Sequence, residues 1–201
     1  ITAPLVIAVL IFAPVLLARA EPPRVLSVVA EQADDARTVV AAFADNARRD
    51  ARGEIRAYLE AAAPAINAEA ITAFDAAPNR AAGIEAARAV VVRRAPRAAG
   101  AFPAPTERYQ IAQPPTSDIQ GMRAYLDGTS ALPDGRSLYG ALNIRRIDGA
   151  PVIEYWSVNL SHDEPSNIAR RAMRLAMQRE ALAAQGLPPT EADRLEGFDP
   201  Q

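Results

Sequence analysis

The first eighteen residues of the chain carry no charged side chain, and this apolar run limits what the chain can become more than any other feature. Residues 5–17 read Leu-Val-Ile-Ala-Val-Leu-Ile-Phe-Ala-Pro-Val-Leu-Leu, and ten of these thirteen are Leu, Ile, Val or Phe. On an insertion scale they favour a bilayer by roughly 3 to 6 kcal/mol before the cost of Pro14 is subtracted. We therefore expect residues 1–20, the apolar leader, to form a transmembrane helix, with the folded remainder facing away from the cytoplasm.

The length of the leader leaves two other interpretations open. A helix needs about 20 apolar residues to cross the hydrocarbon core, and the run lies near the lower limit. Because the chain begins with Ile, we expect the membrane helix to be incomplete and the protein to extend upstream. Ala18-Arg19-Ala20 resembles a signal-peptidase site, which favours a removable signal peptide instead. A helix buried in the protein core is the third possibility.

Composition excludes several classes of function. The net charge of −2 gives no strong global attraction to nucleic acid, so we expect no nucleic-acid partner. The chain has no Cys, which excludes disulfides, thiolate zinc sites and cysteine nucleophiles within it. The residues after the leader, about 180 in number, suffice for one domain with a real core. We place this domain at residues 21–187 and interpret residues 188–201 as a linker toward further membrane helices.

The start of this domain is predicted to be a strand followed by a long helix. Residues 24–30 (Arg-Val-Leu-Ser-Val-Val-Ala) are mostly apolar on both faces, as expected for a strand that helices cover on both sides. Asp34 and Asp35 offer an N-cap and a negative first turn for a helix entering at Ala36. The apolar residues then recur at helical spacing until Pro64 ends the helix.

Periodicity and turn residues predict the rest of the domain. Residues 65–99 are Ala-rich and helical in pattern, with residues 89–93 as an alternative short strand. After a Pro/Gly/Ala loop at residues 96–105, the expected elements are a strand at 108–113, a helix at 119–126 capped by Ser117 or Asp118, strands at 138–144 and 152–160, and a helix at 168–185 closed by Gly186.

These elements define the expected fold class. The turn signal Asp148-Gly149 indicates that the last two strands form a β-hairpin, with a loop long enough that they need not pair tightly. The whole predicts an α/β fold, a small mixed sheet of about four strands flanked by amphipathic helices and preceded by the N-terminal membrane helix.

Residues that carry chemistry are few. The chain has one His, His162, and we interpret it as a solvent-exposed turn residue because no second His or Cys completes a metal site. A nucleophile elbow, a Walker phosphate loop and a dinucleotide fingerprint are all missing from the sequence. The carboxylates singled out fall at expected caps or turns, which favours capping over paired acid/base catalysis; they are Asp34, Asp35, Asp127, Asp134, Asp148, Asp163 and Glu164.

Two further groups have a structural and a functional interpretation. Tyr155 and Trp156 adjoin Glu154 on one strand, so one aromatic side chain is expected in the core and its neighbour outside, where it would contact a partner or a lipid headgroup. Four Arg residues on the last helix predict a solvated face, with contact to lipid phosphate or a partner as the alternative; they are Arg170, Arg171, Arg174 and Arg179. We assign no catalytic, cofactor, metal or substrate residue.

The order of these segments resembles a known family. After the leader come Pro-Arg-Val-Leu-Ser-Val-Val (23–29), Ser-Asp-Ile (117–119), Met-Arg-Ala-Tyr-Leu-Asp-Gly (122–128), Leu-Tyr-Gly-Ala-Leu-Asn-Ile (138–144), Val-Ile-Glu-Tyr-Trp-Ser-Val-Asn-Leu (152–160) and a helix ending in Gln-Gly-Leu (185–187). This pattern is similar to the extracytoplasmic domain between the first two membrane helices of type 2 ABC exporter permeases, which include sodium-efflux permeases. The Ala-rich segment 65–99 departs from that pattern.

The resemblance implies a membrane permease subunit that does not itself hydrolyse ATP and needs no cofactor. Its implied partners are a cytoplasmic ABC ATPase subunit, a second permease copy in a homo- or heterodimer, and the lipid bilayer. Its implied location is the cell inner membrane, with residues 21–201 extracytoplasmic. The domain would shape the outer mouth of the pathway or meet a periplasmic partner.

Two alternatives to the exporter permease belong to other functional classes of protein. One is a membrane-anchored periplasmic sensor or ligand-binding domain, in which one helix carries an α/β pocket and signals inward. The other is a secreted structural protein released after Ala20. Several hydrophobic spans after residue 201 would favour the exporter. A cytoplasmic coiled coil and kinase would favour the sensor, and a stop near residue 201 with a basic leader before residue 1 would favour the secreted protein.

Overall fold

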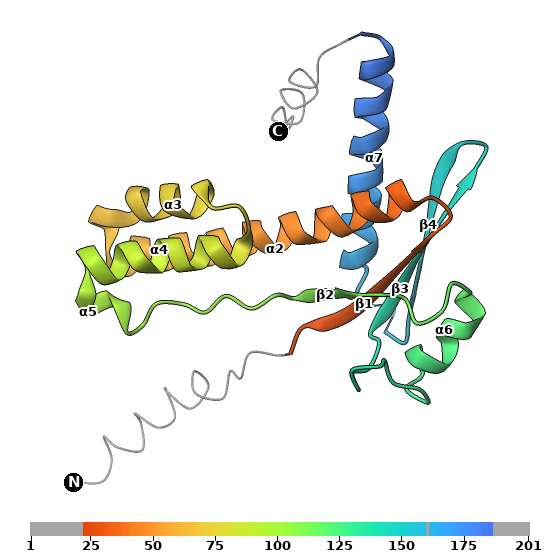
Figure 1. The fold of residues 1–201 in the computed structure, drawn as a ribbon, viewed down its shortest axis with the longest axis horizontal. Coiled ribbons are helices and arrows are strands. Elements are labelled where there is room, and N and C mark those ends of the chain that lie inside the picture. Colours follow the sequence, from red (N-terminus) through yellow and green to blue (C-terminus); the bar gives the residue numbers. More distant parts are fainter. Residues whose placement is uncertain (1–21, 160, 187–201) are drawn as a thin grey trace.

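The computed structural model describes residues 22–159 and 161–186, which form a four-stranded sheet and two groups of helices (Figure 1). The membrane helix expected at residues 1–20 and the linker expected at residues 188–201 lie outside the described residues. In the two described ranges, every helix is either too short or too polar to cross a bilayer.

The sheet is built around the first strand of the domain. β1 (Arg24–Ala30) pairs in parallel with β2 (Tyr109–Ala112) on one side and with β3 (Gly140–Ile147) on the other. β4 (Ala150–Ser157) pairs antiparallel with β3 at the edge, so that the strand order is β2-β1-β3-β4. The expected α/β fold with a mixed sheet of four strands is therefore confirmed. β1 is buried on both faces, as its apolar sequence predicted.

The hairpin of β3 and β4 is tighter than expected. Asp148 and Gly149 both have positive φ, 52° and 81°, which is the conformation of a two-residue type I′ turn. This turn matches the twist of the strands, and pairing runs from Gly140 opposite Ser157 to Ile147 opposite Ala150. The expectation that the two strands need not pair tightly is wrong, because β3 extends to Ile147, three residues beyond the strand predicted at 138–144.

Helices cover both faces of the sheet. α2 (Ala33–Ala62), through its first half, and α7 (Glu164–Ala184) pack on one face, where Val39, Phe43 and Met173 join strand residues in one buried cluster. α6 (Ile119–Leu126) covers part of the other face, with Met122 fully buried. The sheet therefore has two apolar layers, and β1 contributes alternate side chains to each of them.

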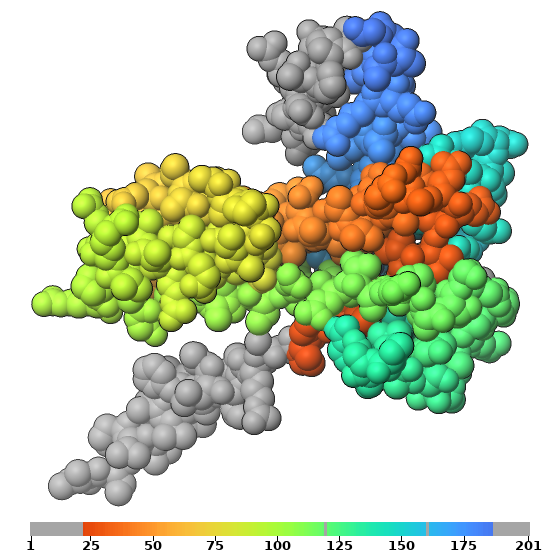
Figure 2. Space-filling view, in the orientation of Figure 1, coloured from red at the N-terminus to blue at the C-terminus, as the bar shows by residue number. Residues whose placement is uncertain are grey.

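The second half of α2 leaves the sheet and forms a separate helical lobe. It packs there with the short 3₁₀ helix η1 (Pro64–Ile66) and with α3 (Asn67–Ala76), α4 (Arg80–Arg94) and α5 (Pro96–Ala99). In Figure 2 this lobe and the sheet region are two masses joined along α2. The helical interpretation of residues 65–99 is thus confirmed. The alternative strand at residues 89–93 is wrong, because these residues lie in α4, which packs Val90 and Val91 into the lobe core.

A half-buried arginine ties α2 to the lobe. Arg48 donates hydrogen bonds to the carbonyl oxygens at the end of α3, those of Phe74 at 3.2 Å, Asp75 at 3.0 Å and Ala77 at 2.7 Å. The N–H of Ala77 also donates to the Phe74 carbonyl, so the guanidinium adds to the backbone bond that closes this helix end. One turn further along α2, Arg52 forms a two-armed ion pair with Asp75, with both N–O distances at 2.8 Å.

Helix ends agree with the sequence in part. Asp118 caps α6 by accepting from two backbone N–H groups, and Gly186 has φ 77° after α7, so both expectations are confirmed. α2 begins at Ala33 rather than Ala36, and Gln32 occupies its N-cap position without a side-chain bond. Asp34 and Asp35 are therefore not caps, although they do supply the negative first turn. α7 begins four residues before the expected start.

Candidate functional site

The carboxyl ends of the parallel strands form the first candidate site. From β1 the chain leaves to one side, through the long helical segment that returns as β2, whereas from β3 it turns to the other side into β4. Ligands of open α/β sheets bind where neighbouring strands diverge in this way, outside their carboxyl ends. A cleft of about 540 Å³ lies at this place, and we call it the strand-end cleft. Its lining includes Glu31, Asp118, Asn143, Arg145, Glu154 and Trp156.

Glu154 is the central polar group of the strand-end cleft. It stands directly opposite Asn143 in the hairpin and accepts a hydrogen bond of 3.2 Å from its side-chain amide. Arg145, two residues further along β3, forms an ion pair with the same carboxylate. The hydrogen bond from Asn143 and the charge of Arg145 outweigh burial and lower the pKa of Glu154. The cleft thus contains an ionised carboxylate beside the half-exposed indole of Trp156.

The turn beside the cleft is held by a second charged group. Arg146 reaches the start of α2, where its guanidinium donates to both oxygens of Asp35, at 2.7 and 3.0 Å. The Asp35 side chain is 5% exposed, so this is a largely buried, two-armed ion pair. The backbone N–H of Arg146 also donates to Glu31 at 3.0 Å. One residue of β3 therefore fixes the β1–α2 turn against the hairpin.

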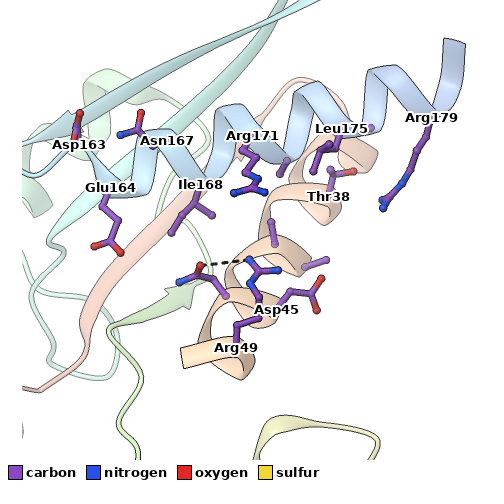
Figure 3. Close-up of a pocket in the computed structure, with 15 residues that line it drawn as sticks. Thr38, Asp45, Arg49, Asp163, Glu164, Asn167, Ile168, Arg171, Leu175 and Arg179 are labelled. Carbon is purple, nitrogen blue, oxygen red and sulfur yellow. Dashed lines mark hydrogen bonds between the residues drawn. The ribbon is translucent and has the colours of Figure 1, made fainter. Parts of the chain in front are cut away.

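A second hollow lies between α2 and α7, with a volume of about 800 Å³ (Figure 3). The small and apolar residues among its lining come from both helices and include Ala41, Ala42, Ala172 and Leu175. Charged side chains of both signs surround it; they are Asp45, Arg49, Asp163, Glu164, Arg171 and Arg179. This groove between two helices offers a surface for a chain segment or another protein, and its groups are not arranged as a nucleophile and a base.

The single histidine is not a fully exposed turn residue. His162 is half-buried, and its ring packs edge-to-face on Tyr139 with the ring centroids 6.4 Å apart. Its Nδ1 has no hydrogen-bond partner among the described residues. The interpretation as a solvent-exposed side chain is therefore wrong, because the imidazole packs against Tyr139, just before β3. Within residues 22–159 and 161–186, no three acidic or His side chains form a group that could hold a metal ion.

The carboxylates that the sequence singled out are dispersed over the molecule. Asp127 accepts from Thr129, Asp134 pairs with Arg136, and Asp148 occupies the hairpin turn. These local bonds lower the pKa of Asp127 and of Asp134. Asp127, Asp134 and Asp148 thus lie in turns, as interpreted, whereas Asp34, Asp35 and Asp163 make no side-chain cap bond.

Glu164 has a longer-range partner. It begins α7 and accepts a hydrogen bond of 2.7 Å from the hydroxyl of Tyr109 on β2. Burial, helped by this bond, raises the pKa of Tyr109. The pair joins the start of α7 to the sheet. Asp163 precedes it at the N-cap position without a side-chain cap bond.

The aromatic pair and the arginine face lie as the sequence indicated. Tyr155 packs in the layer under α2 and α7, and Trp156 lies on the opposite face, in the wall of the strand-end cleft. The four Arg side chains of α7 are exposed. Sequence reasoning missed that Asn143 and Arg145 meet Glu154. The signal was present, since the Asp-Gly turn fixes which residues of the two strands stand opposite each other.

Comparison with protein-family models, with curated proteins and with solved structures found no match to this chain.

Proposed function

We propose that this chain is the extracytoplasmic domain, with part of the first membrane helix, of the permease subunit of an ABC-type exporter. In this role it lies in the cell inner membrane, dimerises with a second permease and couples to a cytoplasmic ATPase that hydrolyses ATP. The domain shapes the outer mouth of the transport path or receives a periplasmic partner there.

The observation that carries the proposal is the position of β1. This strand begins at Arg24, only a few residues after the apolar leader, and it is hydrogen-bonded on both sides. Three extended residues span about 10 Å. A leader held in a bilayer therefore keeps the amino end of the sheet close to the membrane surface. An inner strand cannot leave the sheet without breaking two ladders, so the leader is tied firmly to the domain core.

The order of the elements also supports the proposal. The resemblance expects a first strand, a second strand before a capped short helix, then a strand, a return strand and an amphipathic helix closed by Gly. β1, β2, α6, β3, β4 and α7 occur in this order, with Gly186 after the last helix. The helical lobe is an insertion between β1 and β2 in this order.

The proposal is tested by the location of the domain. The chain has no Cys, so one introduced Cys gives a label without background from these residues. Ala101→Cys lies on an exposed turn, whereas Leu26→Cys lies in the buried β1 and serves as the matched control. In spheroplasts that carry the full-length protein, a membrane-impermeant maleimide is expected to label Ala101→Cys before lysis, and Leu26→Cys only after denaturation.

The exporter proposal predicts two further results. The protein should remain in the membrane pellet after a high-salt or alkaline wash, and a cytoplasmic ATPase should co-purify with it. Labelling of Ala101→Cys only after lysis, or a full-length protein with a single membrane span, refutes the permease. Release into the soluble periplasmic fraction supports the secreted protein instead.

The strand-end cleft favours a second candidate, the membrane-anchored sensor or ligand-binding domain. Its place at the diverging strands and its ionised Glu154 beside an indole are features of small-molecule sites. Trp156 is the only Trp of the chain, so its fluorescence reports on the cleft. A saturable fluorescence change with small amines or sugars, lost in Glu154→Gln, would support the sensor. An unchanged spectrum together with a co-purifying ATPase supports the exporter.

A further inference from the structure

Among the described residues, no strand pairs with the outer edge of β4, which is the longer of the two edges of the sheet. β4 has eight residues, whereas β2, at the opposite edge, has four. Edge strands are usually protected by shortness, by Pro or by basic side chains, because their unpaired backbone groups bind other strands. β4 contains no Lys or Arg, and its single Pro, Pro151, lies at one end.

The hydrogen-bonding pattern of the hairpin shows which backbone groups of β4 point away from β3. The two-residue turn makes Ile147 and Ala150 a hydrogen-bonded pair, so the bonded pairs alternate from there. Two hydrogen bonds on the β1 side of β3 agree with this alternation. The N–H of Arg146 donates to the Glu31 side chain, and the carbonyl of Ile144 accepts from the backbone N–H of Glu31, so even-numbered residues of β3 face β1. Odd-numbered residues of β4 therefore direct their backbone groups away from β3.

The open groups are the N–H donors and carbonyl acceptors of Ile153, Tyr155 and Ser157. The backbone of Pro151 also faces away from β3. Its lack of an N–H therefore removes a donor from the outer edge and leaves the hydrogen bonds to β3 intact. Beyond the strand, Val158 is 74% exposed, the highest value among the large apolar side chains of the described residues. The edge thus combines a row of unused backbone groups with an uncovered apolar residue.

We propose that β4 pairs antiparallel with β4 of a second copy of this chain, about a two-fold axis at Tyr155, and joins the two sheets into one. The inference rests on the proposed function in one respect, namely that a second permease copy is the expected partner. A two-fold contact of this kind uses the same surface on both copies and leaves no open end at the joined edge.

The charges and Pro151 select this register. An axis at Glu154 would place the two Glu154 carboxylates directly opposite each other, which is unfavourable. An axis at Ile153 would place Pro151 of one copy opposite Tyr155 of the other, where Pro151 has no N–H to donate. That register would form about four backbone hydrogen bonds between the copies, compared with about six for the axis at Tyr155. An axis at Tyr155 excludes Pro151 and places Glu154 of one copy opposite Trp156 of the other. It also brings Val152 of one copy to the exposed Val158 of the other.

The register is tested by disulfide cross-linking in membranes with the full-length protein. Two differently tagged copies are co-expressed, one carrying Glu154→Cys and the other Trp156→Cys. In the proposed pairing these positions form a non-hydrogen-bonded pair with Cα atoms about 4.5 Å apart, within the range of a disulfide. We expect a disulfide between the two tags in this mixed pair. Cross-linking of Glu154→Cys to itself, of Trp156→Cys to itself, or no cross-link in any pair overturns the proposal.

A matched pair of substitutions tests the backbone contact itself. Ile153→Pro removes an outward N–H, whereas Ile153→Ala removes the same apolar side chain and keeps the N–H. Both should retain the β3–β4 ladder, which cooperative unfolding of each variant verifies. Placed in both copies, Ile153→Pro is expected to lower the yield of the mixed disulfide roughly tenfold, because the pairing loses two hydrogen bonds. Equal yields for the Pro and Ala variants count against the edge contact.

The outcome is separable from that of the proposed function. External labelling of Ala101→Cys together with no cross-link leaves the exporter standing and refutes the edge pairing. A mixed disulfide together with labelling only after lysis supports the pairing and refutes the exporter.

Discussion

Two glycines on helices of the same lobe should respond to alanine with opposite signs. Gly53 lies on the exposed side of α2, and a Cβ there would have no atom within 4 Å. Gly83 lies in α4 and is buried against Phe74, where a Cβ would be 2.9 and 3.0 Å from two ring carbons and 3.0 Å from the carbonyl oxygen. Alanine improves helix propensity at either position, so the difference between the variants isolates the steric contact.

The magnitudes follow from these contacts. Gly53→Ala gains helix propensity alone and should stabilise the protein by about 0.5 to 1 kcal/mol. Gly83→Ala gains at most the same amount, but it forces apart a fully buried ring and a backbone carbonyl. Overpacking of this kind costs about 1 to 3 kcal/mol, so its net effect should be destabilising. The two variants should differ by several degrees in melting temperature, since 1 kcal/mol corresponds to about 2 to 4 °C at this chain length.

The assay is thermal and urea unfolding of both variants and of the unsubstituted protein, followed by the helical circular dichroism signal. A third variant, Gly83→Ala with Phe74→Leu, removes the ring edge that the new methyl would meet. Alanine at Gly83 should cost less in this background than in the original. If Gly83→Ala were as stable as Gly53→Ala, the close packing of α3 on α4 would be refuted.

Three further predictions concern charged and titrating groups. A double-mutant cycle of Asp35→Asn and Arg146→Gln should give a coupling of about 1 to 3 kcal/mol in the free energy of unfolding, and additive effects would contradict the buried ion pair. The hydrogen bonds from Arg52 lower the pKa of Asp75. Its contribution to stability is therefore complete above the unfolded value, near pH 4, and is lost as the pH falls through the lower folded value, so Asp75→Asn should flatten the acid limb of the stability curve. Burial raises the pKa of Tyr109, so its contribution is complete below the unfolded value, near pH 10, and is lost as the pH rises beyond it. Unfolding of Tyr109→Phe between pH 9 and 11.5 should show a weaker dependence on pH than that of the unsubstituted protein.

Local sequence patterns predicted most helices and strands. The features that they did not predict depend on contacts between residues far apart in the sequence. The β-branched run of β1, the Asp118 cap of α6 and the glycine after α7 each act within one element, and the structure confirms them. The Asp148-Gly149 dipeptide predicts the hairpin turn, and the turn type determines more than the presence of a hairpin. A tight type I′ turn fixes the register of both strands, and this register brings Asn143 to Glu154.

The helical lobe and the buried ion pair lay beyond local reasoning. Residues 65–99 carry a weak and discontinuous apolar pattern, and their packing is decided by the second half of α2. Asp35 and Arg146 are 111 residues apart, and each was interpretable from its neighbours alone, Asp35 as a cap and Arg146 as part of a loop. Their meeting requires β3 to lie beside β1, which the strand pattern does not specify.

The unbroken course of α2 gives the molecule a mechanical property. A helix of 30 residues is about 45 Å long, and this one is embedded in the sheet core at its beginning and in the lobe core at its end. Its stiffness makes it a lever arm. A tilt of only about 5° at the sheet would move the distal end by roughly 4 Å over that length. A small displacement at the sheet would thereby become a larger one at the far lobe.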